Sequence, residues 1–359
     1  MYDVAVIGAG VIGAAIIREL SRFDIRAVIL EKENDVSTGA SKANSGIVHA
    51  GYDPEENTLM ARLNARGNRM YESLCAGLGV PFSRNGSLVV AFDEGQMEHV
   101  ERLRRRGINN GVPGLRILAR DELLSREPNV NPAAHGALYA ETAGIVDPMM
   151  LVAALVSDAV ENGAKYRFGF EVESIESVNG AYEIRSKDRT VRAGCVINAA
   201  GVHSDKIHEM AAPSAFRIMP RRGQYYLLDK SESGIVGSTI FPCPEKNGKG
   251  ILVAPTTHGN VMVGPASDKL LERDDVGTTE ESLDNAIKGA RLLVPSISAR
   301  NAIRTFAGVR AEPDTGDFVI GEAEGAKGFF DAAGIKSPGL TAAPAIAEMV
   351  IEMLIDGGI

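Results

Sequence analysis

Three glycines close to the N-terminus constrain what this chain can fold into. Gly8, Gly10 and Gly13 have the spacing G-x-G-x-x-G; they follow the β-branched run Val4–Ile7 and precede apolar residues at helical spacing up to about Arg22. The first glycine permits a tight turn, the second lets the backbone approach a pyrophosphate, and the third lets the helix pack closely on the strand. The helix N-terminus would then face phosphate groups with unpaired N–H groups and the positive end of its dipole.

A carboxylate follows the next predicted strand. That strand spans residues 26–30 and is followed by Glu31, at a distance from the glycines where a carboxylate can accept hydrogen bonds from both hydroxyls of a ribose. The combination predicts an ADP-containing dinucleotide, and the alternative is a glycine-rich turn that only packs a helix. A carboxylate here would repel a 2′-phosphate, which disfavours NADP, but the motif does not separate NAD from FAD.

Length and charge limit the classes of protein that fit. A chain of 359 residues is long enough for two lobes, and its net charge of −9 argues against a nucleic-acid or anionic-membrane surface. The longest apolar stretch, 342–355, is too short to span a bilayer, and the N-terminus lacks the pattern of a signal peptide. We therefore expect a cytoplasmic protein without a transmembrane segment. Three scattered cysteines predict neither disulfides nor a metal site.

Two later segments favour FAD. Residues 195–201, CVINAAG, read as a strand that ends in small residues. Residues 328–354 read as a strand, a Gly/Ser/Pro loop and a helix beginning near Leu340, with Pro344 expected in its first turn. A C-terminal strand and helix that return to an N-terminal nucleotide fold suit a long cofactor lying across both.

The segment 39–53, GASKANSGIVHAGYD, is rich in small polar residues. Ser41, Asn44 and Ser45 would supply hydroxyls, an amide and unhindered backbone N–H groups along the pyrophosphate and ribityl chain of FAD. His49 would then lie near the redox-active ring.

Five ordered segments together carry a resemblance to a known family. They are SKANSGIVHAGYD (41–53), RRGQYY (221–226), NGKGILVAPT (247–256), FAGVRAEP (306–313) and GIKSPGLTAAPAI (334–346). The chain resembles the D-amino-acid-oxidase superfamily of FAD oxidoreductases, from Met1 to about Leu354. Within it, the chain is similar to the branch of glycerol-3-phosphate oxidases and dehydrogenases, with the L-2-hydroxyglutarate oxidases as near relatives.

The resemblance implies an α/β architecture, a two-lobed FAD-binding Rossmann-like fold with an inserted, mostly antiparallel β-sheet substrate domain. The discontinuous FAD-binding domain would comprise residues 1–79, 145–213 and 308–359, and the substrate domain residues 80–144 and 214–307. The local patterns agree, because 216–229 and 250–265 are β-rich, the latter broken by a predicted turn at 258–260. Residues 278–295 read as a capped helix ending at a proline.

Three residues are predicted to act on the substrate. Oxidising a secondary alcohol requires a base for the hydroxyl proton, and His49 is suited to this because a histidine pKa lies near working pH; alternatively, it only shapes the flavin pocket. The resemblance implies that Arg310 holds the anionic group of the substrate, while the alternative is a structural ion pair with Glu312 or Asp314. It also implies that Lys249 binds phosphate or stabilises the alkoxide, although a solvated turn explains this lysine equally well.

Adjacent strand residues point to opposite faces, so at most one of Arg221 and Arg222 can face the ligand. The dipole of the late helix and the N–H groups of Gly339 and Leu340 would stabilise negative charge on the reduced flavin; the alternative is an ordinary loop entering a helix. The predicted cofactor-binding residues are Gly8, Gly10, Gly13, Glu31, Lys32, Ser41, Asn44, Ser45, Val172, Ala200, Gly201, Gly308, Gly334, Lys336, Ser337, Gly339, Leu340 and Thr341.

The resemblance implies FAD-dependent oxidation of sn-glycerol 3-phosphate to dihydroxyacetone phosphate by hydride transfer to flavin N5. The partner would be a small anionic hydroxylated substrate, and the electrons would pass to oxygen, a quinone or a partner subunit. Such a partner could hold the protein peripherally at the inner membrane face. The alternative substrate is an L-2-hydroxy acid of the 2-hydroxyglutarate type, and the alternative class is a flavin-bearing subunit without a substrate of its own.

Overall fold

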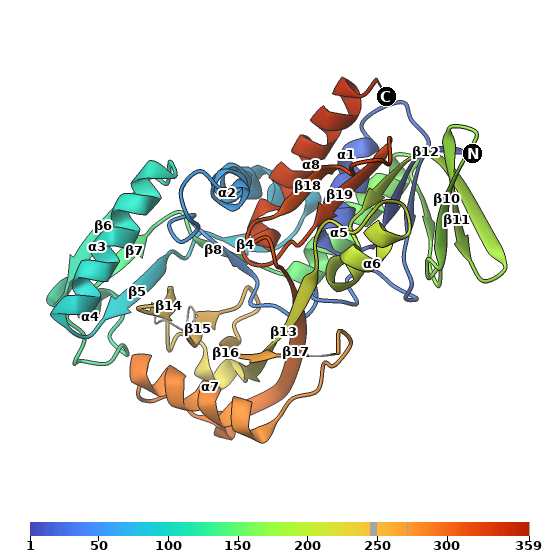
Figure 1. Cartoon of the computed structure of the whole chain (residues 1–359). Helices are drawn as coiled ribbons and strands as arrows, with labels where there is room; N and C mark the ends of the chain where they lie inside the picture. Colours follow the sequence, from blue (N-terminus) through green and yellow to red (C-terminus); the bar gives the residue numbers. More distant parts are fainter. Residues whose placement is uncertain (245–249, 271, 359) are drawn as a thin grey trace.

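The computed structural model describes residues 1–244, 250–270 and 272–358. Its first sheet contains eight strands and is mixed, with β1, β2, β9, β12 and β19 joined in parallel. The antiparallel strands β10, β11 and β18 extend it (Figure 1). The strands are β1 (Tyr2–Ile7), β2 (Ala27–Leu30), β9 (Lys165–Arg167), β10 (Ser174–Val178), β11 (Ala181–Ser186), β12 (Arg189–Asn198), β18 (Val319–Glu322) and β19 (Phe329–Ala333). The two N-terminal strands predicted from the sequence are therefore confirmed, with ends shifted by one or two residues.

Helices pack on this sheet through a common apolar core. Helix α1 (Val11–Leu20) contacts both α5 (Pro148–Glu161) and the C-terminal α8 (Gly339–Asp356). Buried aliphatic side chains such as Ile16, Leu151 and Ile346 join the three helices. The first helix ends at Leu20, two residues earlier than its apolar pattern indicated. The long helix α2 (Leu59–Leu78) packs along α8.

The approach of α2 to α8 depends on a glycine. A Cβ atom added to Gly67 would lie 2.1 Å from the carbonyl oxygen of Thr341. Any side chain at this position would therefore push α2 away from the first turn of α8. Close contact of these helices also brings α2 to the loop that carries His49.

The second sheet also has eight strands and is mostly antiparallel, as the resemblance implied. Its order is β17-β13-β16-β15-β14-β5-β7-β6, and only the β14–β5 pair is parallel among the pairings of the described residues. The strands are β5 (Ser87–Ala91), β6 (Leu115–Ala119), β7 (Gly136–Ala140), β13 (Ile218–Leu228), β14 (Thr239–Pro242), β15 (Leu252–Pro255), β16 (Val261–Lys269) and β17 (Ala302–Pro313). Helices α3 (Glu94–Asn109), α4 (Arg120–Arg126) and α7 (Glu280–Leu293) pack on it.

Local signals account for the predicted helix at 278–295. Thr279 caps α7 by accepting a hydrogen bond from the N–H of Ser282, and Glu280 and Glu281 occupy the first turn, where the helix dipole favours negative charge. The helix ends at Leu293, two residues before Pro295. The predicted turn at 258–260 is also present, between β15 and β16.

Smaller elements complete the structure. A third sheet of three short strands, β3 (Ile47–Val48), β8 (Gly144–Val146) and β4 (Phe82–Ser83), lies between the two large ones in the order β3-β8-β4. Helix α6 (Ser204–Glu209) follows a 3₁₀ turn, η1 (Gly201–His203), and the short turns η2 (Lys230–Glu232) and η3 (Ala299–Asn301) lie in the second lobe. The division into domains at the predicted residues stays a proposal. The predicted boundary between residues 307 and 308 falls within the strand β17.

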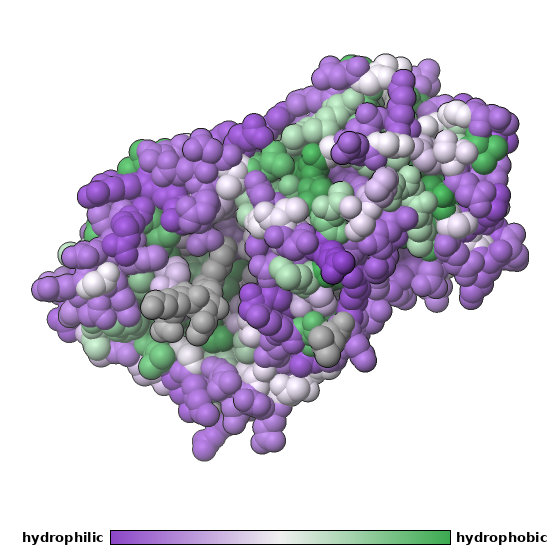
Figure 2. All heavy atoms as spheres, in the orientation of Figure 1, coloured by the Kyte–Doolittle hydropathy of each residue, from purple (hydrophilic) through white to green (hydrophobic). Residues whose placement is uncertain are grey.

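The surface of the face shown in Figure 2 is mainly polar, and its apolar residues are concentrated around α8 and the neighbouring strands β18 and β19. Among the described residues, none of the helices has both the length and the apolar character needed to cross a bilayer. The same residues contain no group of three or more His, Cys, Asp or Glu side chains placed to hold a metal ion. All three cysteines are buried thiols.

Candidate active site

The N-terminal glycines form a turn that leaves no room for side chains at two positions. Gly8 has φ +102°, and a Cβ atom there would lie 2.5 Å from the carbonyl oxygen of Ala199. A Cβ atom on Gly13 would lie 1.9 Å from the carbonyl oxygen of Gly8. Gly10 is the N-cap of α1 and has no side chain to cover the helix N-terminus. These positions fit the predicted approach of a pyrophosphate to the backbone.

Glu31 is fixed at the carboxyl end of β2, beside the glycine turn. The residue is only 8% exposed, and its carboxylate accepts hydrogen bonds from the N–H groups of Ala9 (2.7 Å) and Glu33 (3.0 Å). Ala200 and Gly201 follow β12, which lies on the other side of β1 from β2, and the φ of Gly201 is +58°. Parallel strands of this kind bind dinucleotides at their carboxyl ends, so these residues lie where the adenosine part of FAD would be held.

Two other predicted residues near this edge have defined surroundings. Val172 is buried in the apolar cluster that contains Val28 and Leu30, so its side chain serves the core and any contact with a ligand would come from its backbone. Lys32 is partly exposed, with its ammonium 3.4 Å from both His203 Nε2 and Asp274 Oδ1.

The loop at 39–46 uses its polar side chains to hold its own backbone. Ser41 Oγ accepts a hydrogen bond from the N–H of Val11 (2.8 Å), which leaves the hydroxyl proton as a donor. Asn44 donates to the carbonyl of Ser41 (2.7 Å) and accepts from the N–H of Gly46 (2.8 Å). Ser45 is partly exposed beside them. Of these three predicted ligands, Ser41 and Asn44 thus have structural tasks in the fold.

His49 follows β3 and its backbone is held on both sides. Its N–H donates to Thr341 Oγ1 (2.9 Å), while its carbonyl oxygen accepts from the amides of Asn64 (3.1 Å) and Asn68 (3.0 Å). The ring Nε2 lies 3.3 Å from Ser337 Oγ. The structure therefore brings together three of the predicted residues, His49, Ser337 and Thr341, from segments almost 300 positions apart.

Asn64 and Asn68 were not predicted from the sequence. They lie one turn apart on α2 and are 0% and 4% exposed. Asn68 also accepts a hydrogen bond from Arg84 Nη1 (2.9 Å), so its orientation is fixed in turn. Burying two amides on one face of a helix requires hydrogen-bond partners. The spacing of the two asparagines, i and i+4, which places both on one face of a helix, was the signal in the sequence.

The N-terminus of α8 lies next to His49. Pro338 occupies the N-cap and has no polar side chain, as expected for a helix end that faces a ligand. The N–H of Gly339 donates to the carbonyl of Lys336 (2.6 Å), and that of Lys336 donates to Gly334 (3.0 Å), whose φ is +64°. The N–H of Gly339 is thus used within the turn, which leaves Leu340 as the other backbone donor predicted here.

Pro344 lies in the second turn of α8, so the prediction of a first-turn proline was wrong. A residue at 344 would normally donate its N–H to the carbonyl of Leu340, and proline has no such donor. The hydroxyl of the fully buried Tyr71, on α2, donates to that carbonyl instead. A side chain from another helix therefore makes the proline tolerable.

Arg310 lies on β17, opposite Arg221 on β13. Its guanidinium group lies over Gly223, because a Cβ atom added there would be 2.8 Å from Nη2. Its Nη1 atom lies 3.4 Å from Ser267 Oγ on β16. The neighbouring Gly308 has a similar constraint, because a Cβ atom there would lie 2.2 Å from the carbonyl oxygen of Ala43. This face of β17 therefore touches the loop at 39–46.

The two carboxylates nearest to Arg310 in sequence have other partners. Glu312 accepts from Lys336 Nζ (2.9 Å) and from Arg221 Nη1 (3.4 Å), and Asp314 accepts from the N–H of Arg217. Burial raises the pKa of Glu312, but the hydrogen bonds and charges of Lys336 and Arg221 outweigh it, so this pKa is lowered. These contacts pair Lys336 with a protein carboxylate, whereas Arg310 lies against the hydroxyl of Ser267.

The two adjacent arginines point to opposite faces, as predicted. Arg221 contacts Glu312, whereas Arg222 is buried on the other face with Asp275 (2.7 Å) and Asp268 (3.5 Å). Lys249, the remaining predicted substrate residue, lies outside the described residues.

Comparisons with known proteins show the family to which the chain belongs. A family model described as FAD-dependent oxidoreductase (DAO) matches residues 3–353. The chain is 47% identical over 354 residues to a glycerol 3-phosphate dehydrogenase of Caloramator mitchellensis, covering 99% of this chain and 74% of that protein. It is 29% identical over 292 residues to the mitochondrial L-2-hydroxyglutarate dehydrogenase of Homo sapiens, covering 76% of this chain and 62% of that protein.

A solved structure extends the likeness to three dimensions. The dithionite-reduced L-α-glycerophosphate oxidase of Mycoplasma pneumoniae with FAD bound superposes with a TM-score of 0.94 at 33% identity, covering 99% of this chain and 94% of that one. Together with the glycine turn, the carboxylate at the end of β2 and the returning helix α8, these matches show that the chain belongs to the DAO family of FAD-dependent oxidoreductases, with FAD as its cofactor.

Proposed function

We propose that this protein oxidises sn-glycerol 3-phosphate to dihydroxyacetone phosphate. The observation that carries the proposal is the 47% identity over nearly the whole chain to a protein named as a glycerol 3-phosphate dehydrogenase. The Mycoplasma pneumoniae relative, 33% identical over 98% of this chain, is named as a glycerol 3-phosphate oxidase. When bound, FAD supplies the acceptor for the hydride that leaves the carbinol carbon.

His49 takes the hydroxyl proton in this proposal. A neutral imidazole is a suitable base because the unperturbed pKa of histidine, about 6.5, lies near working pH. The hydrogen bonds to the backbone of His49 from Thr341, Asn64 and Asn68 limit the positions that its ring can take. Ser337 Oγ lies within reach of Nε2 and helps to orient the ring.

Arg310 binds the phosphate in this proposal. A guanidinium offers two parallel donors that match two oxygens of a phosphate. The nearby carboxylates of Glu312 and Asp314 are bound to Lys336 and to the N–H of Arg217, which supports assigning the charge of Arg310 to a substrate anion. Lys249 remains a proposed contributor to phosphate binding or to stabilising the alkoxide.

Anaerobic bleaching of the flavin absorbance tests the proposal. Glycerol 3-phosphate should bleach the holoenzyme, and L-2-hydroxyglutarate at the same concentration should not. Bleaching by 2-hydroxyglutarate alone would overturn the proposal in favour of the L-2-hydroxy acid reaction. Bleaching by neither, with rapid reduction by a partner protein, would instead indicate a relay subunit.

The electron acceptor is a separate part of the proposal. The relatives are named both as dehydrogenases and as oxidases, so oxygen, a quinone and a partner subunit are all proposed acceptors. Hydrogen peroxide formation during turnover distinguishes oxygen from the others, and stimulation by a soluble quinone identifies the second. We also propose a cytoplasmic location, with attachment to the inner membrane face through a partner if oxygen is not the acceptor.

A further inference from the structure

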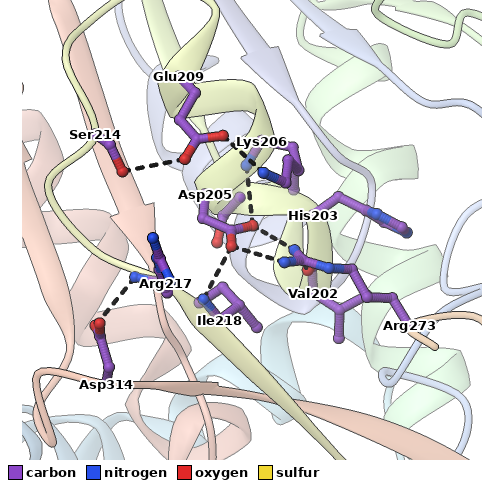
Figure 3. A network of polar contacts seen from close by, with 12 residues as sticks. Val202, His203, Asp205, Lys206, Glu209, Ser214, Arg217, Ile218, Arg273 and Asp314 are labelled. Atoms are coloured by element: carbon purple, nitrogen blue, oxygen red, sulfur yellow. Dashed lines mark hydrogen bonds and ion pairs between the residues drawn. The ribbon is translucent and has the colours of Figure 1, made fainter. Parts of the chain in front are cut away.

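A loop of the second lobe contacts the FAD-binding lobe through a buried ion pair. Residues 272–278 lie between β16 and α7, and Arg273 points from this loop to Asp205 at the start of α6 (Figure 3). Arg273 Nη2 donates to Asp205 Oδ2 (2.8 Å), and Nη1 contacts both Oδ1 and the carbonyl oxygen of Val202. Both terminal nitrogens of the Arg273 guanidinium, Nη1 and Nη2, therefore take part in joining the two lobes.

The surroundings of Asp205 favour a buried carboxylate that is paired with a cation. The residue is 2% exposed, and its carboxylate also accepts the N–H groups of Ile218 (3.0 Å) and Lys206 (2.9 Å). A carboxylate buried in this way is costly without its charged partner. The ion pair with Arg273 is thus held more firmly than one on the surface.

The next residue in the loop reaches the cofactor edge. Asp274 Oδ1 lies 3.1 Å from His203 Nε2 and 3.4 Å from Lys32 Nζ. Lys32 directly follows Glu31 at the end of β2, and His203 ends the 3₁₀ turn that begins at Gly201 after β12. The loop therefore lies against the carboxyl ends of the two strands where the adenosine part of a dinucleotide binds.

We propose that Arg273 and Asp274 form a clasp that retains FAD in its site. Arg273 anchors the loop on α6, and Asp274 holds Lys32 and His203 in place at the adenosine end, so both act as positioning residues. Opening the loop would then be part of FAD release. The proposal depends on FAD being the cofactor and is independent of which substrate is oxidised.

The rate of FAD release from the holoenzyme tests the clasp, measured as the rise of flavin fluorescence after dilution. Arg273→Met should release FAD at least about tenfold faster, because losing one partner of a buried charge pair is strongly destabilising and lets the loop open more often. Asp274→Asn should accelerate release by only about two- to threefold, because Asp274 is exposed and ion pairs of exposed carboxylates are weak. Salt should accelerate release from the unsubstituted protein more than from Asp274→Asn.

Two further variants separate the clasp from general damage. Arg300→Met removes an exposed arginine from η3 of the same lobe and should leave FAD release unchanged. If Arg273→Met does not fold, Arg273→Met with Asp205→Asn removes both charges, while the new amide oxygen can still accept from Ile218. The proposal would be overturned if this double variant and Asp274→Asn both released FAD at the same rate as Arg300→Met.

Discussion

The position of His49 is set mainly by contacts to its backbone. Thr341 accepts a hydrogen bond from its N–H, and Asn64 and Asn68 both donate to its carbonyl oxygen. Three side chains from two helices therefore fix the backbone that carries the ring. A base must be placed within hydrogen-bond reach of the proton it accepts. Residues that never touch the substrate therefore contribute to the proposed reaction.

Replacing His49 by glutamine should slow flavin reduction by glycerol 3-phosphate about 10²- to 10⁴-fold, the usual contribution of a general base. Glutamine retains a polar side chain but cannot accept the proton at neutral pH. Anaerobic stopped-flow absorbance measures the rate, and the content of bound FAD should stay unchanged. His135→Gln, at an exposed position, is the matched control. An unaltered rate in His49→Gln would show that the ring only shapes the pocket.

Asn68→Ala should lower kcat about tenfold or more with a smaller change in KM, because small displacements of a positioned group are costly to the chemical step. The same variant leaves Arg84 without one partner, so we also expect a loss of about 1–3 kcal/mol in the free energy of unfolding. Steady-state kinetics and urea unfolding measure the two effects. Asn109→Ala, at the exposed end of α3, should alter neither. Loss of stability with unchanged kcat would contradict the positioning role.

At the scale of single elements, α8 combines two tasks. Its N-terminus meets His49, and its apolar length fills the core between α1 and α2. Pro344 interrupts its hydrogen bonding in the second turn, and Tyr71 supplies the missing donor to Leu340. Burial raises the pKa of Tyr71 well above its ordinary value, so the hydroxyl keeps its proton and remains a donor.

Tyr71→Phe should lower the free energy of unfolding by about 1–3 kcal/mol, because it leaves the partly buried carbonyl of Leu340 without a donor. Pro344→Ala restores a backbone N–H at the position that can bond this carbonyl. Adding Pro344→Ala to Tyr71→Phe should therefore recover much of the loss. Thermal unfolding of the two single variants and the double variant measures the coupling. Additive effects in the double variant would refute the compensation.

At the scale of the whole molecule, ion pairs connect elements of the two eight-stranded sheets. The pair of Arg273 with Asp205 has an almost fully buried carboxylate, and Lys336 with Glu312 forms a second, more exposed pair. Burial raises the pKa of Asp205, but the hydrogen bonds and charge of Arg273, together with backbone donors, outweigh it and lower this pKa. The native state therefore favours the ionised carboxylate.

A carboxyl group whose pKa is lower in the native state than in the unfolded state stabilises the native state at pH values above its unfolded pKa. This contribution is lost as the pH falls. We therefore expect the free energy of unfolding to change little from this source between pH 7 and about pH 5, and to decline below about pH 4, near the ordinary pKa of aspartate. Urea unfolding over a pH series measures this. Asp205→Asn should flatten the decline, and Asp188→Asn, at an exposed site, should not. Equal acid sensitivity of Asp205→Asn and the unsubstituted protein would exclude the pair as the cause.

The N-terminal nucleotide motif could be predicted because its determinants are close in sequence. Gly13 is required by its contact with the carbonyl of Gly8, Gly8 has a positive φ that suits glycine, and Glu31 follows the neighbouring strand. The helices α1 and α7 were also predicted, with ends displaced by only a few residues, because caps, glycines and prolines act locally. The role of His49 was predicted from the chemistry of histidine and that of Arg310 from the resemblance, and both stay predictions.

By itself, the sequence determined the dinucleotide turn, the alternation of strands and helices and the types of residue available for chemistry, since these depend on neighbours along the chain. Only the tertiary structure decided which distant side chains meet. Asn64 and Asn68 at the carbonyl of His49, Tyr71 at Leu340 and Arg273 at Asp205 are such cases. Periodicity tells which face of an element is buried, but the partner on that face is fixed by packing of the whole chain.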